Sequence, residues 1–492
     1  MKKMKIVSIS SEVDPYSKTG GLADVARSLP KSLHRLGNEV ILITPFYKKT
    51  IDREKYKLKK IYDNVKLYID KENELSVSYY RAELLPKLKV YFISNDKYFS
   101  RYKKLYGSEH ENARFYLFNV AALKLVSLLK FNADIIHCHD WHTGLIPYLK
   151  KTRFKKSETL KKASTVFTIH NLTFQLGNNW WEVPLNKKDK GQKSLPYFNN
   201  SDIEYINFTK RGILHANIVN TVSETYAKQI LYRSIGQDLH RILKNRKYKI
   251  LGVVNGIDYN EYNPKTDRGL YKKYGVSKLH RKVLNKKYLQ KYYNLPIDDK
   301  TPIIVLTSRI AEQKGFDLIL DILPTILKRN IQIIIMGDGD KEYIKKLNKI
   351  KNKNPKKLIV VKFDRKMETS LYAGADLFLL SSRFEPCGIN QLISFRYGCV
   401  PIVRSTGGLS DTVINFDPKD YIGNGFSFKR YSSKELLVAI TRALETYKYK
   451  HVWKELVLRG MKSSFSWELP AQRYIKLYKK AINFKYEQDK MD

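Results

Sequence analysis

The sequence predicts an α/β protein made of two doubly wound parallel-sheet domains. Short β-branched runs alternate with helical patterns along most of its 492 residues, and this alternation breaks once and then restarts. Strands that alternate with helices are typical of βαβ units, which assemble into parallel sheets. Polar and glycine-rich segments follow several of the apolar runs, at the strand ends where α/β sheets bind ligands. We therefore expect two complete sheets that face an interdomain cleft.

The first domain is predicted to span residues 1–253. It opens with a buried strand at Lys5–Ser10, and an amphipathic helix from about Leu22 to Leu36 follows and ends at Gly37. A second helix is expected at about residues 112–129. Four more strands of the same apolar, β-branched character are predicted at Val40–Thr44, Lys89–Ile93, Ala133–Cys138 and Ser164–Ile169.

The second domain is predicted to span residues 254–465. The pattern breaks in the segment VNGIDYNEYNP, whose Asn, Gly and Pro residues indicate an irregular connection. Trp467, Tyr474, Leu477 and Tyr478 recur at helical spacing, so residues 466–492 are expected to form a further helix. Five buried strands are predicted in the second domain, at Pro302–Leu306, Ile331–Met336, Leu358–Val361, Leu377–Leu380 and Val400–Val403.

The net charge of +43, from 91 Lys and Arg against 48 Asp and Glu, suggests an acidic partner. Lys, Asn, Ile and Tyr are all abundant, however, and A/T-rich codons encode them, so codon bias is the favoured source of the surface lysines. The Lys-rich stretch from Lys341 to Lys357 lacks interleaved aromatic residues, and no zinc-finger, KH or RRM motif occurs. We therefore expect no nucleic-acid partner.

The location expected for the protein is the cytoplasm. The start MKKMKIVSIS has too few apolar residues for a signal peptide, and no apolar run approaches the ~20 residues that span a bilayer. Cys138, Cys387 and Cys399 are odd in number and lack CxxC spacing, which argues against a disulfide framework and a zinc site. No membrane partner is expected, and the sequence does not indicate an oligomeric state.

The segment KTGG follows the first predicted strand and precedes a helix. Gly20 and Gly21 leave backbone N–H groups open, the helix N-terminus adds a positive dipole, and Lys18 adds a charge, so the loop suits an anion. A glycine pair also commonly makes only a turn, and both interpretations stay open at this point. The segment is neither GxGxxG nor GxxxxGK[ST], which argues against a dehydrogenase and a P-loop NTPase.

Two more polar clusters end strands of the first domain. In HCHDWH (137–142), side chains alternate between faces, so the cluster converges only with a turn after Cys138, and a metal site is the least favoured interpretation. Asp140 is the member expected to face a ligand, and His170 and Asn171 close the next strand. Because the carboxyl ends of parallel strands lie together, we expect one site, although a histidine at a strand end can also be structural.

Three polar segments follow strands of the second domain. Arg309 and Lys314 in SRIAEQKG suit a diphosphate, which is favoured over two unspecific surface cations. Glu385 in RFEPCG precedes a helix expected at Ile389–Tyr397, where the acid can accept hydrogen bonds from sugar hydroxyls or complement the helix dipole. The segment STGGLSDT opens a helix with a second glycine pair, which predicts a second anion site.

Seven motifs together resemble those of bacterial glycogen synthases and plant starch synthases. In chain order they are KTGGLADV, HCHDWHTGL, FTIHNL, VNGIDY, SRIAEQKG, SSRFEPCG and STGGLSDTV. The resemblance runs from Ile6 to about Tyr478, and KTGGLAD combined with RFEPCG is highly specific for this family. It implies the GT-B fold, in which two Rossmann-like domains face a deep cleft and a C-terminal helix returns to the first domain.

The resemblance implies two groups of diphosphate-binding residues. Lys18, Gly20 and Gly21 resemble the loop that contacts the donor diphosphate and approaches the acceptor. Arg309 and Lys314 resemble the pair that neutralises the distal phosphate. The helix N-terminus at the phosphates is matched by Thr406, Gly407 and Gly408.

The resemblance also implies residues that hold the rest of the donor. Asp140 and His170 resemble residues at the transferred glucose, with His170 beside the anomeric centre. Asn255 matches a glucose-site residue in the connecting segment, and Glu385 matches the acid that positions glucose. Phe363 is at a position where the family stacks an aromatic ring on adenine.

The implied reaction is a retaining transfer of glucose from ADP-glucose to the non-reducing 4-hydroxyl of an α-1,4-glucan. Cations and glycine loops would stabilise the departing diphosphate without a metal ion or other cofactor. The sequence shows no convincing pair of carboxylates like that of retaining glycosidases, so the resemblance suggests front-face attack with the departing phosphate as base. A UDP-glucose-dependent or other GT-B glucosyltransferase is the main alternative, and a non-enzymatic nucleic-acid- or glucan-binding protein is less favoured.

Overall fold

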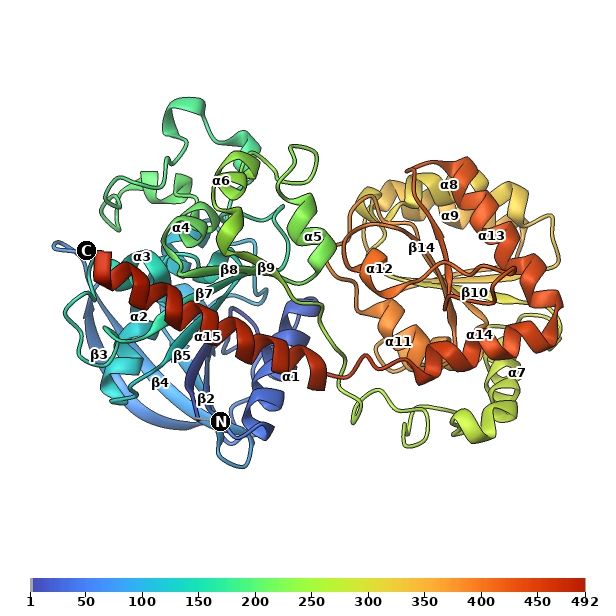
Figure 1. The fold of residues 1–492 in the computed structure, drawn as a ribbon, viewed down its shortest axis with the longest axis horizontal. Helices are drawn as coiled ribbons and strands as arrows, with labels where there is room; N and C mark the ends of the chain where they lie inside the picture. The colour runs from blue at the N-terminus through green and yellow to red at the C-terminus, as the bar shows by residue number, and fades with distance from the viewer. Residues whose placement is uncertain (1–2, 492) are drawn as a thin grey trace. The chain divides into compact units, whose positions relative to one another are not determined.

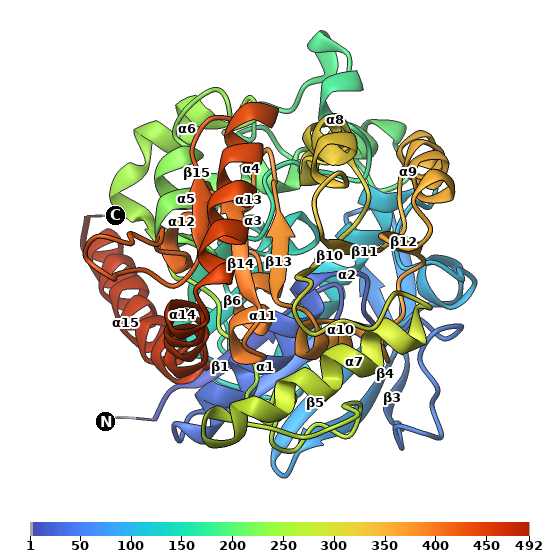
Figure 2. The ribbon, with the colours of Figure 1, turned by 90° about the vertical axis from the view of Figure 1, so that its right-hand side faces the viewer.

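The computed structural model describes residues 3–491, and within them the chain folds into two compact units (Figure 1). Figure 2 shows the same ribbon turned by 90°. Unit 1 contains the chain up to Val253 together with the segment from Trp467 onward, and unit 2 contains Val254–Ser466. Unit 2 is therefore inserted between two segments of unit 1. The chain passes from one unit to the other twice.

Unit 1 is built on a nine-stranded sheet with the order β3-β4-β5-β2-β1-β6-β7-β8-β9. Near its centre, β1 (Lys5–Ile9) pairs in parallel with β2 (Glu39–Pro45) and β6 (Ile135–His139). The pairings from β5 to β9 along this order are all parallel, whereas β4 pairs antiparallel with β3 and β5. The remaining strands are β3 (Lys59–Tyr68), β4 (Glu74–Leu85), β5 (Leu88–Ser94), β7 (Ser164–Ile169), β8 (Ile218–Thr221) and β9 (Ile250–Gly252).

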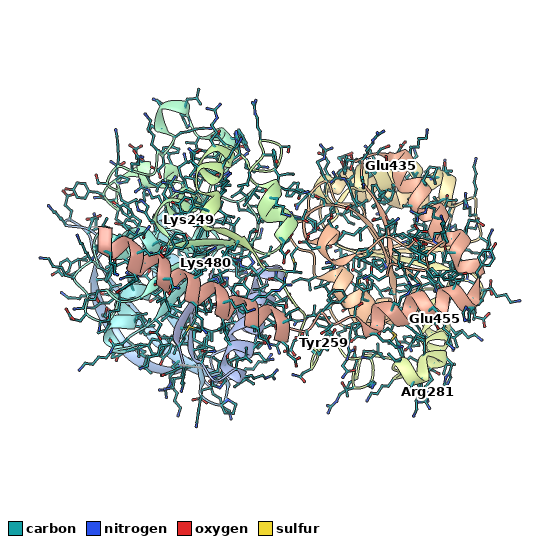
Figure 3. The ribbon with its side chains drawn as sticks, viewed as in Figure 1. Lys249, Tyr259, Arg281, Glu435, Glu455 and Lys480 are labelled. Carbon is teal, nitrogen blue, oxygen red and sulfur yellow. The ribbon has the colours of Figure 1, made fainter. Side chains whose placement is uncertain are left out.

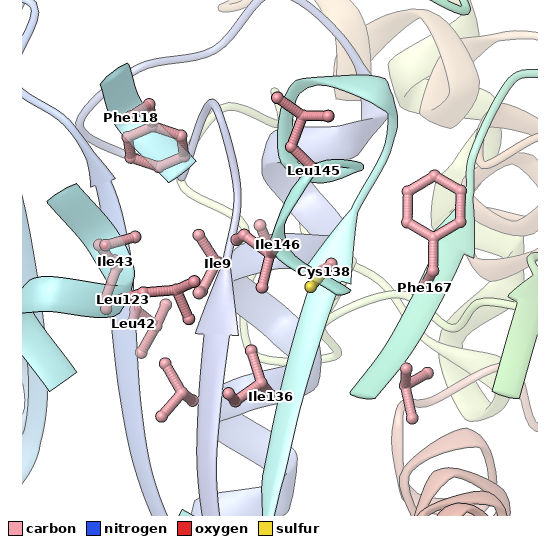
Figure 4. Close-up of a cluster of buried hydrophobic side chains, with 14 of the residues drawn as sticks. Ile9, Leu42, Ile43, Phe118, Leu123, Ile136, Cys138, Leu145, Ile146 and Phe167 are labelled. Atoms are coloured by element: carbon pink, nitrogen blue, oxygen red, sulfur yellow. The ribbon is translucent and has the colours of Figure 1, made fainter. Parts of the chain in front are cut away.

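A continuous apolar core joins this sheet to its helices. Figure 4 shows Ile9, Leu42 and Ile136 from the central strands near Phe118 and Leu123 of α2, all of them buried. The central strands carry apolar residues on both faces because both faces are covered, as expected for a parallel sheet. The helices of this part of unit 1 are α1 (Gly21–Arg35), α2 (Glu111–Leu128), α3 (Ile146–Lys151), α4 (Phe208–His215), α5 (Glu224–Gln229) and α6 (His240–Asn245).

The helix α15 (Glu468–Met491) brings the chain back into unit 1, where it packs against α1, β7 and β8 (Figure 1). Its fully buried residues Ala471, Tyr474, Tyr478 and Ala481 recur every three or four positions and so form one stripe. Lys480 lies outside that stripe and is exposed (Figure 3). The amphipathic pattern thus explains why the helix docks on the unit.

Unit 2 contains a six-stranded sheet, all parallel, with the order β12-β11-β10-β13-β14-β15. Its strands are β10 (Ile303–Thr307), β11 (Gln332–Met336), β12 (Leu358–Val361), β13 (Leu377–Leu380), β14 (Val400–Arg404) and β15 (Phe426–Phe428). Its helices are α7 (Lys282–Tyr292), α8 (Phe316–Ile326), α9 (Lys341–Lys353), α10 (Glu368–Gly374), α11 (Asn390–Arg396), α12 (Gly407–Thr412), α13 (Ser433–Lys448) and α14 (Lys450–Lys462).

The predicted fold class is confirmed, because both units are α/β and centred on parallel strands. Every strand predicted from the sequence is present with bounds that differ by at most two residues. Strands β3, β4, β8, β9 and β15 were not predicted. β3 has mostly exposed residues and two irregularities in its pairing with β4, so it lacks the apolar pattern that marks the buried strands. Across the part of the chain that is described, no helix combines the length and apolarity needed to cross a membrane.

Candidate functional site

In unit 1, Asp140 joins the ends of two neighbouring strands. It is the first residue after β6 and has a positive φ of 58°, so the turn begins after His139, one residue later than expected. Its Oδ1 accepts hydrogen bonds from the backbone N–H groups of His170 at 2.8 Å and Asn171 at 3.4 Å, just beyond β7. Burial raises the pKa of Asp140 to about 7, against the effect of these two hydrogen bonds. The predicted meeting of the two strand ends is thus seen in the structure.

The histidines around Asp140 form hydrogen-bonded chains. Nδ1 of His139 lies 3.0 Å from Nε2 of His170, and Nε2 of His139 lies 3.3 Å from Oγ of Ser8 on β1. His137 contacts Tyr478 of α15 through Nδ1 at 2.9 Å and Thr168 through Nε2 at 2.6 Å. Burial lowers the pKa of His137 and of His170 to about 3. These rings are therefore neutral hydrogen-bonding groups near pH 7.

The KTGG loop stands between β1 and α1. Gly20 and Gly21 are exposed, while Nζ of Lys18 lies 2.5 Å from Oδ1 of Asp24 in the first turn of α1. Gly20 has extended backbone with φ −162°, and a Cβ added there would meet no atom within 4 Å. Neither its conformation nor its packing therefore requires a glycine at this position.

An acid that the sequence analysis missed supports this loop. Oε2 of Glu12 accepts hydrogen bonds from the backbone N–H of Thr19 at 2.6 Å and from its hydroxyl at 2.9 Å. Glu12 is 2% exposed, and burial raises its pKa to about 7. Glu12 could have been found from the sequence by its position just beyond an apolar strand, because an acid at a strand end lies beside the ligand-binding edge of the sheet.

In unit 2, the predicted cation and the predicted acid form an ion pair. Lys314 follows β10, Glu385 follows β13, and these strands are neighbours in the sheet. Nζ of Lys314 lies 2.6 Å from Oε2 of Glu385, which also accepts a hydrogen bond from Oγ of Ser382 at 2.9 Å. Glu385 is 7% exposed, whereas Arg309 is exposed and donates to Oε1 of Gln313 at 3.1 Å.

The second glycine pair packs directly on the Glu385 loop. Gly407 has a φ of +46°, and a Cβ there would lie 1.9 Å from the carbonyl oxygen of Glu385. The N–H of Gly408 donates to the carbonyl oxygens of Glu385 at 3.3 Å and Pro386 at 3.1 Å, and Thr406 is buried beside them. This amide is therefore engaged within the protein in this structure, and the glycine pair holds the backbone of the acid.

Two other predicted residues belong to unit 2, and Asn255 hydrogen-bonds to Cys387 of the RFEPCG segment. Asn255 is 4% exposed, and its Oδ1 has no hydrogen-bond partner among residues 3–491. A buried acceptor without a partner is costly, so a ligand that donates to it would be favoured. Phe363 follows β12 and is 48% exposed, which leaves an aromatic ring available for stacking.

The predicted site residues thus gather at the strand ends of their own units. Asp140 contacts His170 in unit 1, and Lys314, Glu385 and Gly407 contact one another or come close in unit 2. Arg309 instead hydrogen-bonds to Gln313, Asn255 hydrogen-bonds to Cys387 just beyond Glu385, and Phe363 lies on the loop after β12. No group of three or more His, Cys, Asp or Glu side chains in residues 3–491 is arranged to hold a metal ion. Both ring nitrogens of His137 and of His139 are used in hydrogen bonds.

Comparisons with known proteins match nearly the whole chain. Residues 5–245 match the family model described as "Starch synthase catalytic domain", and residues 292–456 match "Glycosyl transferases group 1". A glycogen synthase of Thermosipho melanesiensis is 40% identical over 98% of this chain and 99% of its own length.

Solved structures extend the likeness to three dimensions. The catalytic domain of starch synthase IV from Arabidopsis thaliana, bound to ADP and acarbose, is 30% identical, with a TM-score of 0.87 over 98% of this chain and 100% of that one. Sucrose-phosphate synthase from Thermosynechococcus elongatus is 17% identical and has a TM-score of 0.60 over 97% of this chain and 98% of that one. This second likeness is one of fold alone.

Proposed function

The chain belongs to the family of glycogen and starch synthases, glycosyltransferases of the GT-B fold, and from that premise we propose that its glucosyl donor is ADP-glucose. The acceptor is the non-reducing 4-hydroxyl of an α-1,4-glucan, and the anomeric configuration is retained. The observation that carries the proposal is the Lys314–Glu385 pair at neighbouring strand ends of unit 2. ADP in the structure of the related starch synthase IV supports a sugar donor that carries an adenine nucleotide.

The cations of unit 2 suit the leaving group. When the bond between the anomeric carbon and the diphosphate breaks, the ADP gains negative charge, which preorganised cations stabilise. Lys314 is fixed by Glu385, whereas the exposed guanidinium of Arg309 has a fork that matches a phosphate. We assign the diphosphate to these two side chains, and the adenine to the exposed ring of Phe363.

The hydrogen-bonding groups of unit 1 suit the sugar. A hexose carries hydroxyls and no charge, so it is recognised through hydrogen bonds such as those that Asp140 and His170 offer. The open position at Gly20 supports the same view, since a substrate that passes close to the backbone would explain the missing side chain. We assign the transferred glucose to Asp140, His170, Asn255 and Glu385.

The proposed reaction needs no carboxylate nucleophile. The anomeric C–O bond to the diphosphate breaks, the acceptor oxygen bonds to the anomeric carbon on the same face, and the acceptor proton passes to the departing phosphate. The electron pair of the broken bond stays with ADP, so the step balances without an oxidant, a reductant or another cofactor. Cationic side chains supply the electrostatic stabilisation.

The test is ADP release from ADP-glucose that depends on added glycogen, with UDP-glucose in a parallel reaction. Lys314→Ala should lower turnover about 100- to 1000-fold, because it removes one preorganised cation. The matched control is Lys341→Ala, an exposed lysine of α9 in the same unit, which should keep wild-type turnover. Near-wild-type turnover in Lys314→Ala would refute the site, and faster reaction with UDP-glucose would refute the donor assignment.

A further inference from the structure

The protons of the His137 chain can be placed from its hydrogen bonds, since the buried ring is neutral. The side-chain N–H₂ of Asn220 donates to two backbone carbonyl oxygens, so its Oδ1 is the acceptor. That oxygen accepts the hydroxyl proton of Thr168 at 2.8 Å. Thr168 has then used its only proton, so at 2.6 Å it must accept from Nε2–H of His137. Nδ1 of His137 is left as an acceptor and takes the hydroxyl proton of Tyr478 at 2.9 Å.

The same reasoning orders the chain that reaches His170. Ser8 is 4% exposed, and Nε2 of His139 is the acceptor found for its hydroxyl proton within residues 3–491. If Ser8 accepted instead, its own proton would be buried without a partner, which is unfavourable. Ser8 is therefore the donor, and the single proton of neutral His139 lies on Nδ1. That N–H donates to Nε2 of His170 at 3.0 Å.

This order determines which nitrogen of His170 carries a proton. Burial lowers the pKa of His170 to about 3 and that of His139 below its usual range, so both rings carry one proton. Nε2 of His170 is occupied as an acceptor, and its proton is therefore on Nδ1. The structure shows no hydrogen bond to Nδ1 of His170 from any residue between 3 and 491.

We propose that Ser8 and His139 are positioning residues that hold His170 in its Nδ1–H form, so that the ring offers a hydrogen-bond donor to an oxygen of the bound sugar. The inference rests on the proposed function for its ligand, while the proton order rests on the hydrogen bonds and on the neutral state of the two buried rings. Asp140 fixes the backbone of His170, whereas Ser8 and His139 fix its ring. The protein must impose this form, because a neutral imidazole in water prefers its proton on Nε2.

The first test is the ¹⁵N NMR spectrum of the wild-type protein labelled in its 10 histidines. The His170 signals are assigned by their loss in a His170→Gln variant. We expect the protonated, pyrrole-like shift at Nδ1 and the unprotonated, pyridine-like shift at Nε2 of His170. The reverse assignment would overturn the inference, and no substrate is needed to obtain it.

The second test replaces His139 and compares the same spectrum with the kinetics. In His139→Leu the His170 ring should change to its Nε2–H form, and kcat should fall about tenfold, the equivalent of one hydrogen bond. In His139→Asn, the amide N–H stands near the former Nδ1–H, so the Nδ1–H form and most of kcat should be restored. An unchanged His170 spectrum in His139→Leu would overturn the positioning role.

Two further variants control for a folding defect and test the role of Ser8. Cys138→Ala is the matched control, because this neighbour on β6 points to the opposite face of the sheet, and it should leave the spectrum and kcat unchanged. Ser8→Ala removes only the hydroxyl, and we expect a mixture of the two His170 forms. A pure Nδ1–H form in Ser8→Ala would remove Ser8 from the proposal. If the wild-type spectrum agrees but no nucleotide-glucose supports glucan synthesis, the proposed function fails while the proton order stands.

Discussion

The sequence Thr-Gly-Gly-Leu-x-Asp occurs in both units, at residues 19–24 and 406–411, and its two copies have different surroundings. Each copy follows a parallel strand and opens a helix. In the first copy, Gly20 is exposed and extended, with no atom within 4 Å of an added Cβ, whereas in the second copy Gly407 is buried with a left-handed backbone. Identical residues thus have two structural roles. In the first copy the glycine leaves the protein surface open, and in the second it allows two backbone segments to pack closely against each other.

The second copy also connects the glycine pair to the predicted acid. The Glu385 carbonyl rests where a side chain of residue 407 would lie, and the Glu385 carboxylate pairs with Lys314. A substitution there should therefore act on the fold and the site together. A substitution in the first copy should affect ligand binding with little effect on folding.

Gly407→Ala should have the largest effect. A Cβ 1.9 Å from the carbonyl oxygen of Glu385 forces that loop to move, and alanine also disfavours a φ of +46°. We expect turnover to fall at least about 100-fold, since small displacements of positioned groups cost that much, and stability to fall by at least about 2 kcal/mol. Chemical denaturation and glycogen-dependent ADP release measure the two effects. Wild-type stability and turnover in Gly407→Ala would contradict the close packing of Gly407 on Glu385.

Glu12→Gln should change the pH dependence of stability by about 2–3 kcal/mol. Burial raises the pKa of Glu12 from its ordinary value of 4.5 to about 7 in the folded protein, so the folded protein binds the extra proton between these values. Its favourable contribution is complete below pH 4.5 and is lost as the pH rises through 7. The wild type should therefore lose stability relative to Glu12→Gln between pH 5 and pH 8. Urea unfolding of both proteins at pH 5 and pH 8 checks this. The same change in stability with pH in the wild type and in Glu12→Gln would contradict a raised pKa of Glu12.

Gly20→Ala should separate binding from folding. No atom lies within 4 Å of the new Cβ and the backbone is extended, so stability should stay within about 0.5 kcal/mol of the wild type. If a substrate passes this position, kcat/KM should fall about tenfold, or about 1.4 kcal/mol. Thermal unfolding and steady-state kinetics on one preparation test both statements. Unchanged kinetics would remove Gly20 from the binding loop.

Lys18→Met should lower stability by no more than about 1 kcal/mol and leave the fold intact. The Lys18–Asp24 pair has side chains that are 27% and 22% exposed, and pairs near water contribute about 0–1 kcal/mol. The loss should shrink further in 1 M salt, where charges are screened within about 3 Å. A loss above about 2 kcal/mol would show that the loop of the first copy contributes to folding as the second does.

The strands and the clusters at their ends could be predicted, because buried parallel strands are short apolar runs and their carboxyl ends share one edge. The pairing of Lys314 with Glu385 could not be derived, since 71 residues separate them and their strands become neighbours only through the sheet order. The difference between Gly20 and Gly407 was also hidden, because their local sequences agree. β3 was missed because its charged, exposed residues have no apolar period. The Lys314–Glu385 pair and the surroundings of the two glycines depend on contacts between residues far apart in the sequence, which local sequence patterns do not show.

The return of α15 to unit 1 has a consequence for biosynthesis. A ribosome makes residues 254–466 before it makes the helix that fills the α15 position, so unit 2 can complete its core while that of unit 1 still lacks Tyr474 and Tyr478. During that interval the surface that will receive the helix is open to chaperones and to proteases. The hydrogen bond from Tyr478 to His137 forms only when α15 docks. A truncated translation product therefore carries every motif of unit 1 but lacks the helix that closes its core.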